Sequence, residues 1–302
     1  MISLGIDTSA YTTSLVVMEN QTILYEDRCL LKVKKGTVGL RQADAFFQHV
    51  QNLPELYKGL SEVVDIKSIE KIVVSSRPRP VEDSYMPVFT AGMRFAETVS
   101  LSLGIPMITL SHQENHLYAG LLDYPTDKAF IGVHISGGTS EILDVNQKRE
   151  IKIIGDTLDL SFGKLIDRLG VYMGLDFPAG RAMDGLVSES IYKLKHSIKD
   201  LSFNISGIEN QLKQHYDNDK DIDKVSHSLF VYLSELLIKV LDKAIEETDY
   251  DLIIMSGGVS ANNTIRKTLC DYYGKKIHFT PVDYATDHAI GNAYYGNVVM
   301  TY

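Results

Sequence analysis

The sequence presents one order of predicted elements twice. In the first half we predict three strands within residues 2–30, a helix at 39–60, a strand at 71–76, a helix at 89–105 and a strand at 107–110. In the second half we predict three strands within residues 130–157, strands at 251–256 and 276–279, and helices at 161–174, 224–247, 260–274 and 287–300. The residues of the two halves hardly agree, so the repeat lies in the order of the elements. It predicts two α/β lobes of similar topology.

This plan is that of actin, hexokinase and the heat-shock ATPase chaperones. We therefore predict an α/β fold of two actin-like lobes, of the ASKHA and ribonuclease-H-like type, around a nucleotide-binding cleft. The N-terminal lobe is expected over residues 1–110 and the C-terminal lobe over residues 111–302, with the metal site described below near their junction. Residues 175–223 fit the plan poorly and are expected to be an insertion that ends in a charged, solvated loop or helix start. Pro54 is expected to break or restart the first helix.

Composition narrows the class of protein. The 302 residues carry a formal net charge of −9, which opposes broad electrostatic attraction to nucleic acid or anionic lipid. The chain has no apolar run long enough to cross a bilayer and no basic leader before Asp7, so we expect a cytoplasmic protein without a membrane partner. The two cysteines, Cys29 and Cys270, are too few for a disulfide framework and are expected to be reduced bystanders.

Three loops have the composition of phosphate-binding turns. Asp7 ends the first buried strand and precedes several hydroxyl side chains, so this turn can offer donors to a phosphate while Asp7 holds a metal ion, directly or through water. The turn SGG at 136–138 occupies the equivalent hairpin of the second half, and SGG at 256–258 joins a strand to a helix N-terminus. Each turn alone is common in proteins. Together, with two at matching positions of the repeat, they favour a nucleotide in the cleft.

The segment HQENH contains two histidines four residues apart. On a helix, His112 and His116 share one face and can reach one metal ion, while Glu114 points away from that face. The metalloprotease signature needs a glutamate directly after the first histidine, where this chain has Gln113. Zinc-protease chemistry is therefore disfavoured.

A metal site needs a third ligand, and the start of the last predicted helix supplies a candidate. Asp287 is either an ordinary N-cap of that helix, in competition with Thr286, or the carboxylate that completes a site of two histidines and one carboxylate. His288 is a competing donor.

The ordered motifs resemble one family across essentially the whole chain. They are GIDTS, HQENH, SGG, FGKLIDRLG, GLDFPAG, FNISG, SGGVSANN and TDHA. The family is that of the TsaD-type tRNA threonylcarbamoyltransferases, formerly called O-sialoglycoprotein endopeptidases or glycoproteases. No single motif is decisive, whereas their order and spacing are specific. The chain is identified as a divergent member or a paralogue.

The resemblance implies roles for the matching residues. Members hold one divalent metal ion, iron or zinc, through an HxxxH pair and a later aspartate, which match His112, His116 and Asp287. The residues implied to bind the adenine nucleotide, with or without Mg²⁺, are Ser136, Gly137, Gly138, Thr139, Asp167, Gly180, Asp184, Gly257, Gly258 and Asn262. Within this set, Asp167, Gly180 and Asp184 would hold ribose hydroxyls, and Asn262 would lie near the adenine. The candidate catalytic residues are Asp7, Ser9 and Thr12 of the first hairpin.

The reaction implied by the resemblance is acyl transfer. A threonylcarbamoyl adenylate made by another enzyme would bind with its carbamoyl group near the metal, and N(6) of a tRNA adenosine next to the anticodon would attack, releasing AMP. The metal would polarise the carbonyl. The acidic charge of the chain argues for helper subunits in tRNA binding. The helices at 39–60 and 89–104 are candidates for a homodimer or heterodimer contact or for internal packing.

Departures from the family pattern concentrate where the acceptor would bind. Tyr11 and Thr12 replace an acidic pair, and the loop 75–87 carries Arg77, Arg79 and Glu82 in place of small residues. The arginines either are solvated parts of a proline-rich turn or grip a carboxylate or phosphate. Two alternative functions follow: a carbamoyl-type transferase with a different acceptor, or a nucleotide-binding scaffold subunit. The sequence leaves the acceptor and the choice between iron and zinc open.

Overall fold

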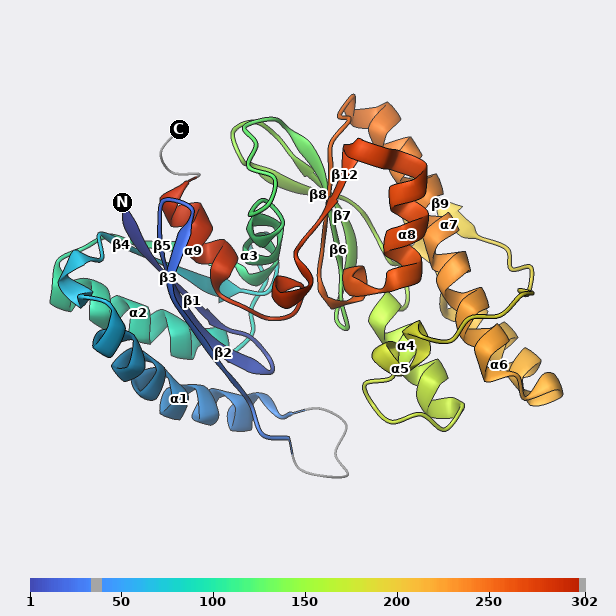
Figure 1. The fold of residues 1–302 in the computed structure, drawn as a ribbon, viewed down its shortest axis with the longest axis horizontal. Helices are drawn as coiled ribbons and strands as arrows, with labels where there is room; N and C mark the ends of the chain where they lie inside the picture. The colour runs from blue at the N-terminus through green and yellow to red at the C-terminus, as the bar shows by residue number, and fades with distance from the viewer. Residues whose placement is uncertain (34–39, 299–302) are drawn as a thin grey trace. The chain divides into compact units, whose positions relative to one another are not determined.

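A five-stranded sheet in the order β3-β2-β1-β4-β5 forms the first half of the chain (Figure 1). The computed structural model describes residues 1–33 and 40–298. The three antiparallel strands are β1 (Ile2–Thr8), β2 (Thr12–Glu19) and β3 (Thr22–Leu30), and the two parallel strands beyond β1 are β4 (Lys71–Arg77) and β5 (Met107–Ser111). Tight turns suffice between antiparallel strands, whereas parallel strands require a crossover, which here is helical. The three predicted strands in residues 2–30 are confirmed.

Side chains of β1 alternate between two helical layers. Leu4 and Ile6 belong to the core that contains the inner residues of α1 (Gln42–Val63) and α2 (Phe89–Leu103). On the opposite face, the Ser3 hydroxyl donates to the carbonyl oxygen of Ala293 at 2.6 Å, on α9 (Ile290–Asn297). Because Asp7 shares the face of Ser3, its carboxylate points to the layer that contains α9 and α3 (His112–Ala119).

The second half of the chain repeats this sheet. Its order is β12-β11-β6-β7-β8, which is the order of the first sheet read from the other edge. The strands are β6 (Phe130–Ile135), β7 (Ser140–Val145), β8 (Ile151–Asp156), β11 (Ile253–Ser256) and β12 (Ile277–Phe279). One core lies under its helices, which are α4 (Phe162–Tyr172), α5 (Gly180–Asp184), α6 (Ser206–Asp219), α7 (Ile222–Thr248) and α8 (Asn263–Tyr273). The predicted repeat of element order is confirmed.

The chain divides into two compact units at other places than the predicted lobes. The first unit comprises Met1–Pro125 and the chain from Thr280 onward, and the second comprises Thr126–Phe279. The expected boundary between residues 110 and 111 differs from this division. Ser111 is both the last residue of β5 and the N-cap of α3, so the two elements are continuous and belong to one unit. The C-terminal helix α9 joins the first unit because it packs on β1 and α3.

One local expectation, a break at Pro54, differs from the structure. Pro54 lies inside α1 without ending it, so the predicted break is wrong: the missing N–H removes one hydrogen bond from a helix that its buried face holds in place. The segment 175–223 contains α5, the hairpin of β9 (Ser197–Lys199) and β10 (Ser202–Asn204), and α6. The charged residues at the end of this segment form the last turn of α6, the short connection after it and the first turn of α7. Residue 39 of the first predicted helix and residues 299 and 300 of the last lie outside the described residues.

Within residues 1–33 and 40–298, no helix combines the length and the apolar composition that crossing a bilayer requires. The longest, α7, has 27 residues but carries Glu235 on its exposed side.

Candidate functional site

The helix α3 is short and begins with a strong local signal. The Ser111 hydroxyl accepts from the backbone N–H of Glu114, and the Glu114 carboxylate accepts from the N–H of Ser111, which is a complete capping box. Glu114 also lies 3.7 Å from the guanidinium of Arg77. It is therefore turned away from the histidine face, as the spacing predicts.

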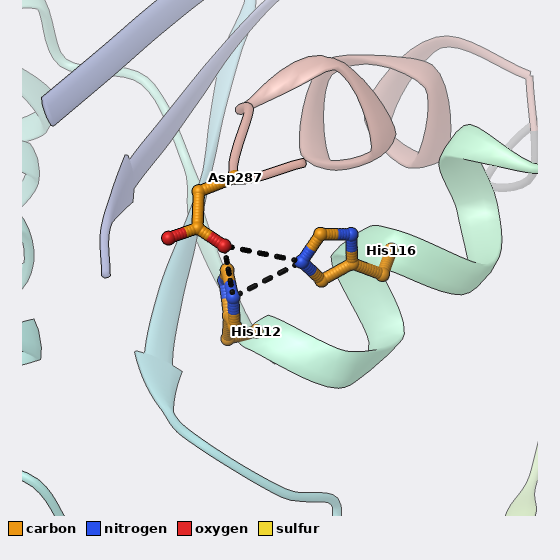
Figure 2. A group of neighbouring side chains, drawn as sticks. All are labelled: His112, His116 and Asp287. Atoms are coloured by element: carbon orange, nitrogen blue, oxygen red, sulfur yellow. Dashed lines mark hydrogen bonds and ion pairs between the residues drawn. The ribbon is translucent and has the colours of Figure 1, made fainter. Parts of the chain in front are cut away.

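His112, His116 and Asp287 converge on one point (Figure 2). The Nε2 atoms of the two histidines are 3.1 Å apart, and Oδ1 of Asp287 lies 3.3 Å from Nε2 of His112 and 3.5 Å from Nε2 of His116. Donors that share a metal at bond lengths of about 2.0–2.2 Å lie about 3–3.5 Å from one another. The donor set thus fits a divalent metal ion, and two histidines with one carboxylate on one side leave coordination positions open.

Burial makes the charges of this cluster interdependent. Burial opposes protonation of His112, but the carboxylates of Asp7 and Asp287 outweigh it and raise its pKa to about 10. Burial and the adjacent positive His112 lower the pKa of His116. Burial would raise the pKa of Asp287, yet hydrogen bonds from the two imidazoles hold it well below its usual range. Without an ion, His112 therefore carries a proton and Asp287 a negative charge. That proton lies where a metal ion would replace it.

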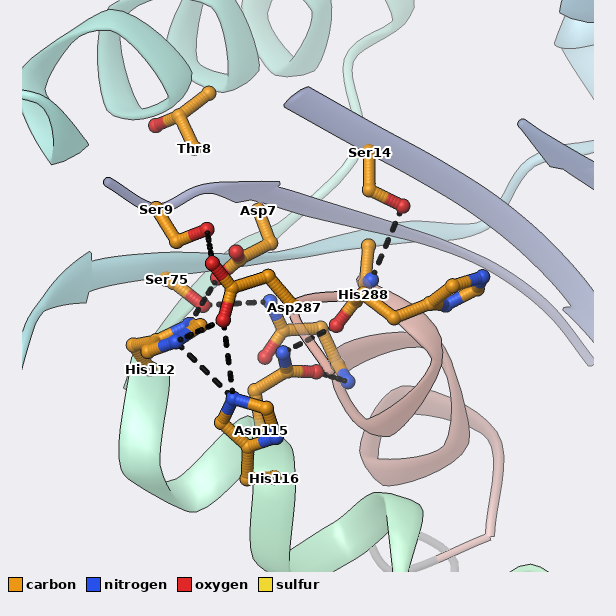
Figure 3. Close-up of polar contacts among 12 residues, drawn as sticks. Asp7, Thr8, Ser9, Ser14, Ser75, His112, Asn115, His116, Asp287 and His288 are labelled. Atoms are coloured by element: carbon orange, nitrogen blue, oxygen red, sulfur yellow. Dashed lines mark hydrogen bonds and ion pairs between the residues drawn. The ribbon is translucent and has the colours of Figure 1, made fainter. Parts of the chain in front are cut away.

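The first hairpin supports both sides of the cluster (Figure 3). Nδ1 of His112 donates to Oδ1 of Asp7 at 2.9 Å, and the Ser9 hydroxyl donates to Oδ2 of Asp287 at 2.7 Å. Asp7 is fully buried, and its Oδ2 has no hydrogen-bond partner among the described residues. A carboxylate behind a histidine ligand fixes the tautomer and ring orientation. Asp7 and Ser9 are thus placed to orient two candidate ligands.

Thr12, the third predicted catalytic residue, makes no side-chain hydrogen bond to the three candidate metal ligands among the described residues. It is buried at the start of β2, and its backbone carbonyl, rather than its hydroxyl, lies 3.5 Å from the Ser9 hydroxyl. The neighbouring Tyr11 is 42% exposed.

Close packing of two helices brings Asp287 to the histidines. A Cβ on Gly291 of α9 would lie 1.8 Å from the backbone oxygen of Asn115, so only glycine lets α9 approach α3 this closely. The Asn115 side chain then accepts from the N–H of Asn292 at 2.8 Å and donates to the carbonyl of His288 (Figure 3). The Asn115 side chain thus joins α3 to α9 and to the chain just before α9 through two hydrogen bonds.

Asp287 is not a helix cap. The helix α9 begins at Ile290, and Ala289 precedes it without a side-chain cap. The cap interpretation is therefore wrong, because the carboxylate is engaged by Ser9 and the imidazoles. His288 does not compete for the cluster: its Nδ1 accepts from the N–H of Ile290, and its Nε2 lies 4.0 Å from the carboxylate of Glu26, with which it lines a separate polar cavity of about 300 Å³.

In the second unit, the two diglycine turns lie side by side. Residues 136–138 follow β6 and residues 257 and 258 follow β11, and these strands are parallel neighbours. Gly257 has φ +87°, and a Cβ there would lie 2.4 Å from the backbone oxygen of Ile135. The Ser136 hydroxyl accepts from the N–H groups of Gly138 and Thr139, which shapes the first turn. Gly258 opens a short 3₁₀ turn that leads to α8.

The residues predicted to bind ribose and adenine lie on the helices around these turns. Asp167 accepts from the N–H of Ala179 at 2.8 Å, and burial raises its pKa against the hydrogen bonds from Ala179 and Gly180. Asp184 accepts from the backbone and side chain of Asn263 at the first turn of α8. Asn262 caps α8 through the N–H of Ile265. Both carboxylates are thus held at a helix end.

Two residues next to His112, His116 and Asp287 were not predicted from the sequence. His49 is fully buried on α1 and bonds to the first hairpin, and Asn115 joins α3 to α9. Asn115 lies inside HQENH and could have been noticed as a polar residue between two ligands. A single histidine in an apolar helical pattern gives no such signal.

Comparison with known proteins bears on the whole chain. A sequence model of TsaD, described as tRNA N6-adenosine threonylcarbamoyltransferase, matches residues 34–294. The tRNA N6-adenosine threonylcarbamoyltransferase of Mycoplasma mobile is 29% identical over 295 residues, which cover 95% of either chain. A probable bifunctional tRNA threonylcarbamoyladenosine biosynthesis protein of Methanocaldococcus jannaschii is 25% identical over 98% of this chain and 55% of its own length.

Solved structures agree with the predicted fold class. HypF in its phosphate- and nucleotide-bound form matches with a TM-score of 0.65 at 14% identity, over 99% of this chain and 55% of that chain. A ROK family glucokinase from Streptomyces griseus, in complex with glucose and AMPPNP, matches with a TM-score of 0.51 at 13% identity, over 97% and 98%. The fold is the α/β fold of the actin-like proteins.

Proposed function

The chain belongs to the tRNA N6-adenosine threonylcarbamoyltransferase family, and from this premise we propose that it transfers a threonylcarbamoyl group from threonylcarbamoyl-AMP to N(6) of a tRNA adenosine next to the anticodon. The observation that supports this proposal best is the convergence of His112, His116 and Asp287. A hydrolytic role for Glu114 finds no support, because its carboxylate caps α3.

The residues of the first unit would act on the acyl group. His112, His116 and Asp287 would hold one Fe²⁺ or Zn²⁺ ion, which would act as a Lewis acid on the acyl carbonyl. Asp7 accepts the proton on Nδ1 of His112 and so would leave Nε2 available to such an ion. Ser9 donates to Oδ2 of Asp287 and so would leave Oδ1 available to it.

The residues of the second unit would bind the AMP part of the donor. The turns at 136–138 and 256–258 end neighbouring parallel strands, and their glycines would let a phosphate come close to the backbone ahead of the 3₁₀ turn that leads to α8. Asp167 and Asp184 can accept hydrogen bonds from ribose hydroxyls through oxygen lone pairs not used by Ala179 and Asn263.

The acceptor side supports a role for partners. The chain has a formal net charge of −9, and Arg77 of the loop 75–87 is paired with Glu114 rather than free to bind a phosphate. Basic helper subunits would then supply much of the attraction to tRNA. A cytoplasmic location and a dimer contact through α1 and α2 stay predictions.

The decisive experiment incubates the purified protein with threonylcarbamoyl-AMP and unmodified tRNA and measures modified nucleoside and AMP by mass spectrometry. Formation of both in equal amounts supports the proposal. Release of AMP without modified nucleoside would point to another acceptor. Absence of turnover with metal bound, including in the presence of helper subunits from a related system, would favour a scaffold.

A further inference from the structure

His49 is a buried histidine to which the proposed chemistry gives no role. It lies on the inner side of α1 with no exposed surface, one turn before the core residue Leu53. A polar ring in this position is costly unless its nitrogens are hydrogen-bonded. Both are: Nδ1 is 2.8 Å from the hydroxyl oxygen of Thr13, and Nε2 is 2.8 Å from the backbone oxygen of Ser9.

These contacts determine the tautomer of the ring. A backbone oxygen can only accept, so Nε2 of His49 carries the proton that bonds to Ser9, and Nδ1 accepts from the Thr13 hydroxyl. The side chain of Asn52, three residues further along α1, donates to the same Thr13 oxygen at 3.1 Å. α1 therefore holds the turn between β1 and β2 at both of its ends.

The same turn reaches the metal cluster. The Ser9 residue whose carbonyl accepts from His49 donates through its hydroxyl to Oδ2 of Asp287, at 2.7 Å. The other oxygen of that carboxylate faces the two imidazoles. A shift of the Ser9 backbone would move its hydroxyl and allow the Asp287 carboxylate to rotate away from the position that completes the donor set.

We propose that His49 is a positioning residue for the metal cluster: it holds Ser9 from α1, and Ser9 in turn holds Asp287. This inference rests on the proposed metal site. It differs from a merely structural role for His49, which would affect stability alone. Loss of the contact between His49 and Ser9 is expected to weaken metal binding about tenfold. This is the low end of what residues behind the ligands contribute, because His49 acts through one intermediate residue.

Two amide substitutions separate the contacts of His49. His49→Gln places an amide nitrogen where Nε2 was and can still donate to Ser9. His49→Asn is shorter, so its amide lies near the position of Nδ1 and cannot reach Ser9. Both are polar and neutral, which makes them a matched pair. Leu53→Ala is the stability control, because Leu53 is buried on the same helix face and belongs to the apolar core.

The measurements are the Kd of Zn²⁺, by competition with a chromophoric chelator, and the visible spectrum of the Co²⁺-loaded protein, with the thermal midpoint recorded for each variant. We expect His49→Asn to weaken Zn²⁺ binding about tenfold and to change the Co²⁺ spectrum. We expect His49→Gln to bind within about threefold of the parent, and Leu53→Ala to lose stability with unchanged affinity.

Equal affinities for His49→Asn and His49→Gln would overturn the proposal, as would a loss in Leu53→Ala equal to that in His49→Asn. If His49→Asn does not fold, an affinity for His49→Gln at least tenfold weaker than the parent's also overturns it. Absence of Zn²⁺ and Co²⁺ binding by the parent protein would instead remove the metal site of the proposed function, and this inference with it.

Discussion

Nδ1 of His112 lies 2.9 Å from Oδ1 of Asp7, although the two residues are 105 positions apart in the chain. Asp7 is fully buried at the end of β1, and His112 is the first residue of α3. A carboxylate that accepts from the far nitrogen of a ligating histidine orients the ring and makes the near nitrogen more basic. Metal binding at this cluster should therefore depend on a residue that does not face the ion.

Asp7→Asn should weaken binding of Zn²⁺ by about 10–100-fold, because the neutral amide neither fixes the tautomer of His112 nor raises its basicity. The Kd from chelator competition measures this. Glu19→Gln, at the exposed end of β2, removes the same charge away from the cluster and should leave the Kd unchanged. Equal effects of the two substitutions would show that only net charge matters.

Asp287→Ala should reduce metal binding more than Asp7→Asn does, because it removes a donor atom rather than the support of one. Bound metal is counted by mass spectrometry after dialysis. Asp283→Ala, four residues earlier and exposed, is the control. Chelation of the metal should lower the thermal midpoint of the parent and of Asp283→Ala, but not of Asp287→Ala, since a ligand that binds only the folded state stabilises it. Full metal retention in Asp287→Ala contradicts the assigned donor set.

Gly291→Ala should destabilise the protein by about 1–3 kcal/mol or more, since the added methyl group meets the backbone oxygen of Asn115, which cannot move without shifting α3. Urea unfolding measures the loss. Gly185→Ala is the matched control: Gly185 has φ −82°, and a Cβ there meets no atom within 4 Å. Weaker Zn²⁺ binding should accompany the loss in Gly291→Ala only, as α9 moves away from α3.

Stability should fall as the pH drops from about 6.5 to about 4. Burial, followed by the positive charge of Arg28, lowers the pKa of His288 to about 4, and burial lowers the pKa of His49. Their folded pKa values lie below the unfolded value near 6.5, so in this range the unfolded state binds more protons, and each group contributes a slope of up to about 1.4 kcal/mol per pH unit.

Urea unfolding at several pH values tests this slope. His49→Gln removes one of the titrating groups, so its stability should depend less steeply on pH in that range, whatever its absolute stability. A slope as steep as that of the parent would assign the acid sensitivity to other groups.

Much of the fold could be predicted because it depends on local patterns. The alternation and periodicity of apolar residues identified the two sets of strands and helices, and their repeated order indicated an actin-like fold. The four-residue spacing of His112 and His116 was sufficient to place them on one face, since a helix brings such residues together whatever surrounds it. The motif Ser111 to Glu114 caps the same helix with residues from a single turn.

Contacts between distant segments could not be predicted in this way. Asp287 has the sequence context of an N-cap, and only the packing of α9 against α3, which Gly291 permits, makes it the third donor. Pro54 predicts a break by its chemistry alone, but the buried face of α1 keeps the helix continuous.

Local sequence patterns predicted most of the strands and helices and the residues that could serve a metal or a phosphate, because propensity and periodicity act within a few residues along the chain. Which of these residues come into contact depends on how the elements pack. His49, Ser9 and Asp287 lie on three segments: α1 packs on one face of the first sheet through the apolar core, α9 is hydrogen-bonded to the other face, and Ser9 contacts both of the other two residues. Packing of that kind is a property of the whole unit, so no single stretch of the chain reveals it.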